Sequence, residues 1–331
     1  MVDFNPRNFR MWSMMGLNPC IWSIAFPEVI VQHAETVALT ADLARYSGMM
    51  RTWNANPDRF YNVGIAEQNM VGIAAGLAMC GQQVFMTTYA PFMTYRCADQ
   101  LRHLVGNHKL DIKAIGSAAG LSAGLSGSSL LAVSDIAFAR SIPNMTVLSP
   151  ADCTEAIKML LAMAECRGPV YMRFCGTVNI PVVYKSDYEF KIGKAYELKE
   201  GDRILIAATG TTLVADALKA AALIEEKMGF SPAVVNFPTI KPLDTVYLES
   251  AAGRFECIYT VEEHSVIGGF GSAVCEFAAS HKGFPPVHVL GVPDKVPSLG
   301  HRPYMLEQCG LTANGIAERI ASDLPKTVDM S

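Results

Sequence analysis

The sequence has little charge, no C-x-x-C pair and no long apolar run. Charged residues make up 18% of its 331 residues, and the formal net charge is −4. This balance excludes a general binder of the nucleic-acid backbone. The apolar runs are shorter than the roughly 20 residues of a membrane-spanning helix, and residues 1–10 lack the apolar core of a signal peptide. We therefore expect a cytoplasmic protein without a membrane or nucleic-acid partner.

The nine cysteines are scattered along the chain. Their number is odd and their spacing suggests neither a disulfide framework nor a metal site, so we expect reduced, mostly buried thiols. Half of the residues are hydrophobic, which is enough for large cores. The length suggests two domains of ordinary size.

Short strand-like apolar runs alternate with helix-like segments in both halves of the chain. This alternation predicts an α/β fold with two domains, each with a mostly parallel sheet flanked by helices. We place an N-terminal segment at 1–28, the first domain at 29–178 and the second domain at 193–325. Pro181 and several polar residues interrupt the pattern at 179–192, which we interpret as a linker.

The N-terminal segment is rich in Met and Trp. Its apolar residues between Met11 and Trp22 can form an amphipathic helix, covered either by its own domain or by another chain. The expected strands are residues 37–43, 61–63, 83–88, 112–116, 142–148, 168–173, 203–208, 232–237, 257–261 and 287–290.

One stretch combines a turn, a helix start and a carboxylate. Tyr61–Val63 ends a short strand, Gly64 supplies a turn, and good helix formers follow from Ala66. Glu67 falls in the first turn of that helix, where the helix dipole favours a carboxylate. The local pattern leaves two interpretations open: Glu67 only caps the helix, or it is a functional carboxylate.

The segment from Gly64 to Met70 reads G-I-A-E-Q-N-M. It resembles the G-I-x-E-x-x-M segment of the thiamine-diphosphate enzymes of the transketolase family. In that family the Glu hydrogen-bonds N1′ of the cofactor's aminopyrimidine, so the resemblance implies that Glu67 is catalytic and binds thiamine diphosphate. The resemblance covers nearly the whole chain and implies a pyrimidine-binding domain followed by the family's C-terminal domain.

Four further residues match cofactor-binding positions of the resembled family. Asp42 follows a predicted buried strand, at the end of a sheet where ligands gather; a helix-capping Asp is the alternative. Tyr89, Phe92 and Tyr95 recur at i, i+3 and i+6 and share one helical face. Such a stripe is either core or, as the resemblance implies, a wall against the aminopyrimidine ring.

Two glycine-rich features are rejected as cofactor sites. Gly268-Gly-Phe-Gly271 lacks the third glycine and the acidic partner of a dinucleotide loop. Gly201-Asp202 is similar to the start of the family's magnesium motif G-D-G, but it precedes its strand and no Asn pair follows. We therefore expect no metal ligand in this chain.

The missing diphosphate domain implies a two-chain enzyme. The chain resembles the C-terminal subunit of a split transketolase, and a separate N-terminal subunit would bind Mg²⁺ and the diphosphate. Thiamine diphosphate would then lie between the subunits, in an assembly of two of each that acts on sugar phosphates.

The substrate loop departs from the family pattern D-G-x-[ST]-H-Q. Ser126 stands for the Asp, Leu130 for the His and Leu131 for the Gln. Leucine cannot donate a hydrogen bond to a sugar oxygen, and removing one such donor costs about 10²–10³ in rate. We expect weak ordinary transketolase activity or an altered, less hydroxylated donor at Leu130.

Two further residues complete the substrate side. The resemblance places Arg173 where the family's Arg grips the acceptor phosphate, to which a guanidinium is suited; a surface ion pair is the alternative. His264 matches a structural or rim position and is not expected to be catalytic.

The leading hypothesis is transfer of a two-carbon ketol unit from a ketose to an aldehyde through thiamine diphosphate. An acyl-transferring dehydrogenase β-subunit shares the expected fold and the Glu. A catalytically weakened scaffold subunit is the non-enzyme alternative, which the leucine at position 130 favours.

Overall fold

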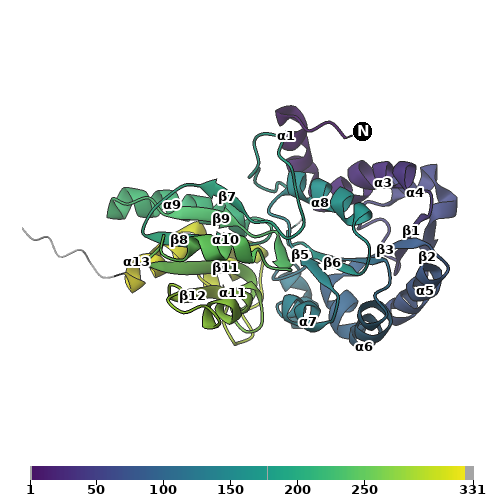
Figure 1. Cartoon of the computed structure of the whole chain (residues 1–331). Helices are drawn as coiled ribbons and strands as arrows, with labels where there is room; N and C mark the ends of the chain where they lie inside the picture. Colours follow the sequence, from purple (N-terminus) through teal and green to yellow (C-terminus); the bar gives the residue numbers. More distant parts are fainter. Residues whose placement is uncertain (1, 177, 325–331) are drawn as a thin grey trace, which may run out of the picture.

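The computed structural model describes residues 2–176 and 178–324 and shows two α/β domains side by side (Figure 1). The expected end of the second domain at 325 lies outside the described residues. The predicted fold class is confirmed, because each domain contains a mostly parallel sheet with helices on both faces. None of the helices in the described part of the chain is long and apolar enough to cross a membrane.

The first domain is built on a seven-stranded sheet. Its strands, from edge to edge, are β10 (Thr239–Lys241), β5 (Thr146–Leu148), β6 (Val170–Arg173), β4 (Ile112–Ser117), β3 (Gln83–Tyr89), β1 (Thr36–Thr40) and β2 (Phe60–Asn62). All neighbours are parallel except β10 and β5. The C-terminal ends of β1, β2 and β3 therefore meet at one edge of the sheet.

Strand β10 belongs to the second half of the chain but completes the first sheet. Thr239 pairs with Leu148 and Lys241 with Val147, and the Lys241 ammonium donates to the carbonyls of Arg140 and Ile142 at 2.9 and 2.6 Å. This strand could not be predicted from the sequence, because three residues are too few to show the alternation of a β-strand.

Helices cover both faces of the first sheet (Figure 1). Their bounds are α1 (Pro6–Met15), α2 (Leu17–Pro19), η1 (Cys20–Ala25), α3 (Phe26–Gln32), α4 (Met50–Ala55), η2 (Pro57–Arg59), α5 (Glu67–Met79), η3 (Phe92–Arg96), α6 (Ala98–Gln100), η4 (Leu101–Asn107), η5 (Gly124–Ser126), η6 (Ser128–Leu130), α7 (Asp135–Ser141) and α8 (Cys153–Glu165). Strand residues alternate between the two faces. Val37 and Leu39 face the cluster that includes α5, whereas Ala38 faces the cluster of α8 and the N-terminal helices.

The N-terminal segment packs on its own domain. Trp12, Trp22 and Phe26 are buried and share one hydrophobic cluster with Phe85 of the sheet. Helix α3 runs across the boundary expected at residue 28, so the segment is continuous with the first domain.

The second domain has a five-stranded sheet. Its strands are β12 (Val287–Val292), β11 (Cys257–Ser265), β8 (Ile204–Ala208), β9 (Ala233–Asn236) and β7 (Tyr196–Lys199), with β7 antiparallel at the edge. Its helices are α9 (Leu213–Met228), α10 (Thr245–Ala251), α11 (Phe270–Ala279), α12 (Arg302–Gln308) and α13 (Ala313–Asp323). Phe237 and Phe270 share a core cluster with Met70 of the first domain, so the hydrophobic interior runs across the two domains.

A buried carboxylate fixes the linker. Glu155 on α8 accepts hydrogen bonds from the hydroxyls of Tyr184 and Tyr188 at 3.0 and 2.9 Å and from the Asn236 amide of β9 at 2.9 Å. Asp152, the N-cap of α8, accepts from the Glu155 backbone amide and from the backbone amides of Val183 and Tyr184. Burial raises the pKa of Glu155 to about 7.

All nine cysteines lie within the described residues and are free. Most are buried, as expected.

Candidate active site

Polar side chains gather where β1 and β2 end. Asp42 follows β1 with a positive φ of 58°, and Asn62 is the last residue of β2. The side-chain Nδ2 of Asn62 donates to Asp42 Oδ1 at 2.9 Å. The side-chain Oδ1 of Asn62 accepts from the backbone amides of Asp42 and Gly64, both at 3.0 Å. Asn62 therefore joins the two strand ends, and the exposed Asp42 caps no helix. A cavity of about 370 Å³ bordered by Asp42 and Tyr46 opens beside them.

Glu67 is the first residue of α5, and its side chain is buried. The turn before it is made by Gly64, whose φ of +77° suits glycine. No helix amide donates to its carboxylate; instead Arg96 Nη1 donates to Glu67 Oε1 at 2.8 Å. Helix capping, one of the two interpretations of Glu67, thus finds no support in these contacts.

Arg96 is a residue that the sequence analysis missed. It lies on η3, which is tied to α5 twice, because the Gln68 amide also donates to the Arg96 carbonyl at 3.0 Å. The Arg96 guanidinium stacks over the Phe92 ring, 4.0 Å from its centroid. The spacing of four residues from Phe92 could have indicated a shared helical face.

Tyr89 and Phe92 form an aromatic pair, which Arg96 connects to the Glu67 carboxylate. Their rings stack with centroids 5.9 Å apart, and both side chains are half-buried instead of forming core. Burial raises the pKa of Tyr89, and the neighbouring phenol of Tyr46 adds to the shift. Tyr46 thereby links the Asp42 loop to the aromatic pair.

Tyr95 is separated from the other two rings. Its hydroxyl accepts hydrogen bonds from the backbone amide and the hydroxyl of Ser134, both at 2.9 Å. Burial raises its pKa, with Asp135 as the second cause. Tyr95 therefore contacts the start of α7 through its hydroxyl, and its place in the expected aromatic wall stays a prediction.

Glu67, Phe92 and Tyr89 fit the aminopyrimidine half of thiamine diphosphate. The flat faces of two half-buried rings can pack against a heterocycle, and a buried carboxylate beside them can accept or share a proton. The described residues include no cluster of His, Cys, Asp and Glu suited to a metal ion.

The substrate loop is fastened at its ends. Gly120 and Ala132 exchange two backbone hydrogen bonds of 2.9 and 3.0 Å, and Leu130 ends the short helix η6 between them. The Leu130 side chain is half-buried, whereas Leu125 on the same loop is 68% exposed. Leu130 thus lies on a loop of defined shape.

Arg173 is not placed for phosphate binding. It is 1% exposed, its Nε donates to Asp135 Oδ2 at 2.8 Å, and Nη2 donates to the carbonyls of Ala132 and Glu263 at 3.2 Å. Tyr171 donates to the same Asp135 oxygen at 2.7 Å. The expected phosphate-gripping role gives way to a buried ion pair that joins the domains, because every contact of the guanidinium points inward.

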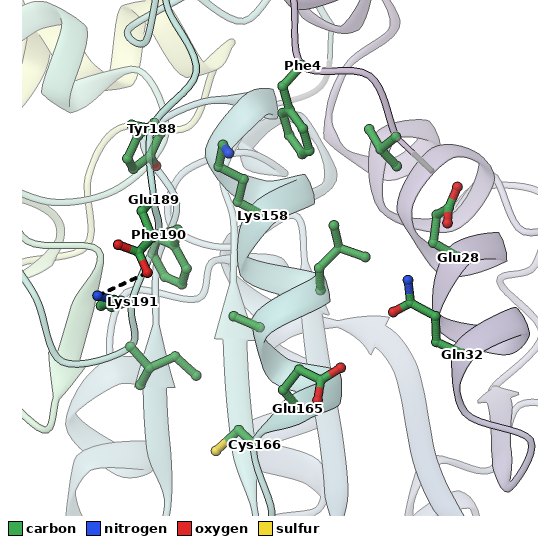
Figure 2. Close-up of a pocket in the computed structure, with 14 residues that line it drawn as sticks. Phe4, Glu28, Gln32, Lys158, Glu165, Cys166, Tyr188, Glu189, Phe190 and Lys191 are labelled. Atoms are coloured by element: carbon green, nitrogen blue, oxygen red, sulfur yellow. Dashed lines mark ion pairs between the residues drawn. The ribbon is translucent and has the colours of Figure 1, made fainter.

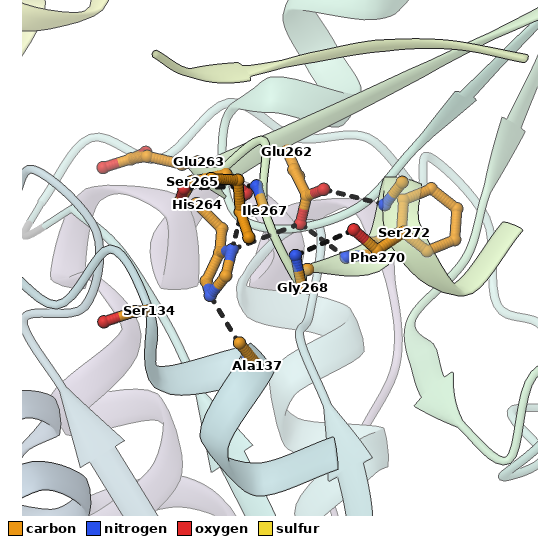
Figure 3. Close-up of polar contacts among 12 residues, drawn as sticks. Ser134, Ala137, Glu262, Glu263, His264, Ser265, Ile267, Gly268, Phe270 and Ser272 are labelled. Carbon is orange, nitrogen blue, oxygen red and sulfur yellow. Dashed lines mark hydrogen bonds and ion pairs between the residues drawn. The ribbon is translucent and has the colours of Figure 1, made fainter. Parts of the chain in front are cut away.

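The backbone amides of the glycine-rich loop after β11 donate to side chains of this chain, Gly268 to the Ser272 hydroxyl and Phe270 and Gly271 to Glu262 (Figure 3). The Glu262 carboxylate accepts from the amides of Phe270 and Gly271 at 2.6 and 2.7 Å. His264 Nδ1 donates to the Ser265 carbonyl, and Nε2 accepts from the Ala137 amide of α7 at 3.2 Å. His264 is buried and structural, as the sequence analysis expected.

Glu263 ties the substrate loop to the second domain. Its carboxylate accepts from the Leu121 amide at 2.8 Å and from Arg302 Nε at 3.1 Å. Arg302 also donates to the Thr212 hydroxyl at 2.8 Å. Glu262, Glu263 and His264, with Arg173 and Arg302, form what we call the interdomain hub.

A groove of about 670 Å³ lies elsewhere, between α3, α8 and the linker (Figure 2). Lys158 on α8 points toward Phe4, 3.9 Å from the ring centroid, and pairs with Asp187 at 2.5 Å. Its charge is already partnered, and the groove is remote in the fold from Glu67 on α5.

Comparison with known proteins agrees with this geometry. Residues 22–176 match the family model "Transketolase, pyrimidine binding domain", and residues 193–316 match "Transketolase, C-terminal domain". A putative transketolase C-terminal section of Methanocaldococcus jannaschii is 35% identical over 297 residues, which cover 89% of this chain and 92% of that protein.

Two further similar proteins are described by name as a subunit or as the product of a split gene. A 6-deoxy-6-sulfo-D-fructose transketolase subunit of Clostridium sp. (strain MSTE9) is 35% identical, over 88% of this chain and 90% of its own. A solved structure, described as an inactive β4 tetramer of a split-gene transketolase, superposes with a TM-score of 0.83 at 34% identity, covering 95% of this chain and 99% of that chain.

Proposed function

Since this chain belongs to the transketolase family, we propose that it is the C-terminal subunit of a split transketolase, active only with an N-terminal subunit. Together they would transfer a two-carbon ketol unit from a ketose to an aldehyde. Thiamine diphosphate supplies, when bound, the nucleophilic carbon that attacks the ketose. This chain would hold the pyrimidine half, and the partner would hold the diphosphate and Mg²⁺.

The observation that carries the proposal is the buried carboxylate of Glu67 beside a stacked aromatic pair at the carboxyl ends of parallel strands. Glu67 would bind N1′ of the ring and control its proton. Phe92 and Tyr89 would orient the ring, and Asp42 would border it. The buried position excludes water from the carboxylate, which strengthens a single hydrogen bond there.

A partner subunit is the second part of the proposal. The names of relatives as subunits, and the inactivity of one β4 assembly, support a requirement for a second chain. We propose an assembly of two copies of each subunit.

Co-expression with an N-terminal-type subunit that carries the G-D-G motif, sought first in the neighbouring reading frame, tests the proposal. We expect the pair to bind thiamine diphosphate, and light scattering after size exclusion to give two of each chain. Glu67→Ala should reduce ketol transfer by at least 10²-fold, the scale of losing one catalytic hydrogen bond. Turnover by this chain alone would contradict the split assignment, and unchanged turnover in Glu67→Ala would favour the scaffold alternative.

The donor specificity rests on Leu130. Because leucine replaces a hydrogen-bond donor at the substrate loop, we propose a donor sugar with fewer hydroxyls at that contact, and weak turnover of xylulose 5-phosphate. Leu130→His should raise that turnover, measured beside the parent complex. Full parent activity with no gain in the variant would show that the missing His is irrelevant.

The acyl-transferring dehydrogenase alternative can be distinguished from the proposed transketolase by its acceptor substrate. An acyl-transferring β-subunit would act with a lipoyl carrier, whereas the proposed enzyme would act with an aldehyde acceptor. Assays of the same complex with each acceptor distinguish the two.

A further inference from the structure

The Glu67 carboxylate already has a partner in this chain, and the form of that partner is informative. Arg96 Nη1 donates to Glu67 Oε1 at 2.8 Å, and the same guanidinium lies 4.0 Å from the centroid of Phe92. One planar, nitrogen-bearing group therefore donates to the carboxylate and stacks on the aromatic ring at once.

These are the two contacts that the proposed function assigns to the aminopyrimidine ring. Arg96 lies over one face of Phe92 and donates to one oxygen of Glu67. The guanidinium and the heterocycle cannot both occupy that face and bind that oxygen at the same time. We propose that Arg96 takes the position of the aminopyrimidine in the cofactor-free chain and has to swing away when the cofactor binds. This inference rests on the proposed function.

The surroundings of Arg96 allow such a movement. Its side chain is 45% exposed, whereas that of Glu67 is 5% exposed. Among the described residues, Glu67 is the one hydrogen-bond partner of the guanidinium. An ion pair with one end in solvent is screened and is released at small cost. The helix backbone need not move, because the carbonyl of Arg96 is held separately by Gln68.

The arrangement gives Arg96 two effects. Without cofactor, the guanidinium satisfies a carboxylate that would otherwise be buried without a partner. When the cofactor binds, Arg96 competes with it for the same site. The apparent affinity for the cofactor is therefore weaker, because displacing Arg96 costs part of the binding free energy. Removing Arg96 should therefore tighten cofactor binding while destabilising the cofactor-free chain.

The test uses the co-expressed complex, Arg96→Met and the matched control Arg102→Met. Arg102, six residues after Arg96 in the chain, pairs with the exposed Asp99, so it reports on loss of a surface charge that does not contact Glu67. Calorimetric titration with thiamine diphosphate and Mg²⁺ should give about three- to fivefold tighter binding in Arg96→Met than in the parent. Arg102→Met should equal the parent.

Thermal melting of the chain alone supplies a second readout without activity. We expect Arg96→Met to melt below the parent and Arg102→Met to melt with it. Arg96→Lys keeps the charge but loses the planar fork, so it should retain the melting temperature better than Arg96→Met and still bind the cofactor more tightly than the parent.

Weaker binding in Arg96→Met would overturn the proposal, because Arg96 would then be a cofactor ligand. Equal binding in parent and Arg96→Met would also overturn it. A parent complex that binds no thiamine diphosphate would instead refute the proposed function itself, so the two failures are distinguishable.

Discussion

Two clusters of charged residues in this chain differ in how completely they are bonded. The interdomain hub is buried except for Arg302, whose side chain is 14% exposed, and each carboxylate of Glu262 and Glu263 has two or more donors. The Glu67–Arg96 pair has one hydrogen bond, and its cation is half-exposed. The first cluster holds the domains in place, whereas the second has capacity left for a ligand.

The comparison explains why a charged residue near a strand end is weak evidence for a functional site. Arg173 is the last residue of β6 and Arg96 lies on η3, after β3, and only Arg173 matched a functional position in the sequence. Arg173 donates to Asp135 and to two carbonyls, whereas the Arg96 guanidinium donates to Glu67 alone among the described residues. Bonding capacity that remains unused identifies the site better than position does.

The largest effect should come from breaking the hub. Arg173→Met leaves Asp135 buried and without its cation, and losing one partner of a buried pair costs about 3–5 kcal/mol. We expect a large decrease in the urea midpoint of the chain. The exposed pair of Arg102 and Asp99 is the control, and an Arg173→Met midpoint equal to that of Arg102→Met would remove the distinction between the clusters.

The linker carboxylate should give a pH-dependent effect of similar size. Glu155 has a folded pKa of about 7, above the ordinary value of 4.5. The folded state therefore binds more protons than the unfolded state between these values, and stability falls as pH rises from about 4.5 to 7, by roughly 3 kcal/mol.

Glu155→Gln cannot ionise and should flatten this part of the stability profile. Urea unfolding at a series of pH values from 5 to 8 measures the slope in both proteins. Asp152, whose pKa is also raised by burial, is present in both proteins, so the difference between the two profiles reports Glu155 together with its interaction with Asp152. Parallel profiles would show that Glu155 does not titrate in this window.

The smallest effect concerns the tight turn beside Glu262. A Cβ at position 269 would lie 2.1 Å from Glu262 Oε2 and 2.6 Å from His264 Nδ1. Gly269→Ala should therefore destabilise the chain by about 1–3 kcal/mol, the usual cost of overpacking.

Gly72→Ala on α5 is the matched control, because nothing lies within 4 Å of a Cβ there. Alanine is favoured over glycine in a helix interior by about 1 kcal/mol, so the two substitutions should have opposite signs in thermal melting. A change in melting temperature of the same sign in both variants would show that the structure beside Glu262 accommodates a methyl group at position 269.

Much of the fold was predictable because its signals are local. Strands β1, β3 and β8 contain uninterrupted apolar runs at 37–39, 84–86 and 204–208, and the Asp152 cap of α8 has a fixed spacing. The edge strands β7 and β10 were missed, since they are short and owe their conformation to partners far away in the chain.

Residues of the candidate site were predictable where a short sequence motif identifies them. They were less predictable where a side chain can contact several different neighbours. Glu67 follows from its motif and the turn at Gly64. Tyr95 has the same spacing as Phe92, yet its direction depends on Ser134, which the sequence places far along the chain. Spacing along a helix says which residues share a face, not which partner is within reach.

The position of β10 has a consequence for biosynthesis. A ribosome delivers β1 to β6 well before Thr239–Lys241, so during synthesis the edge at β5 stays open until the second domain is partly made. An unpaired strand edge is a template for wrong association. The nascent first domain is thus exposed to mispairing for a defined interval, and a fragment cut at the linker would keep that open edge permanently.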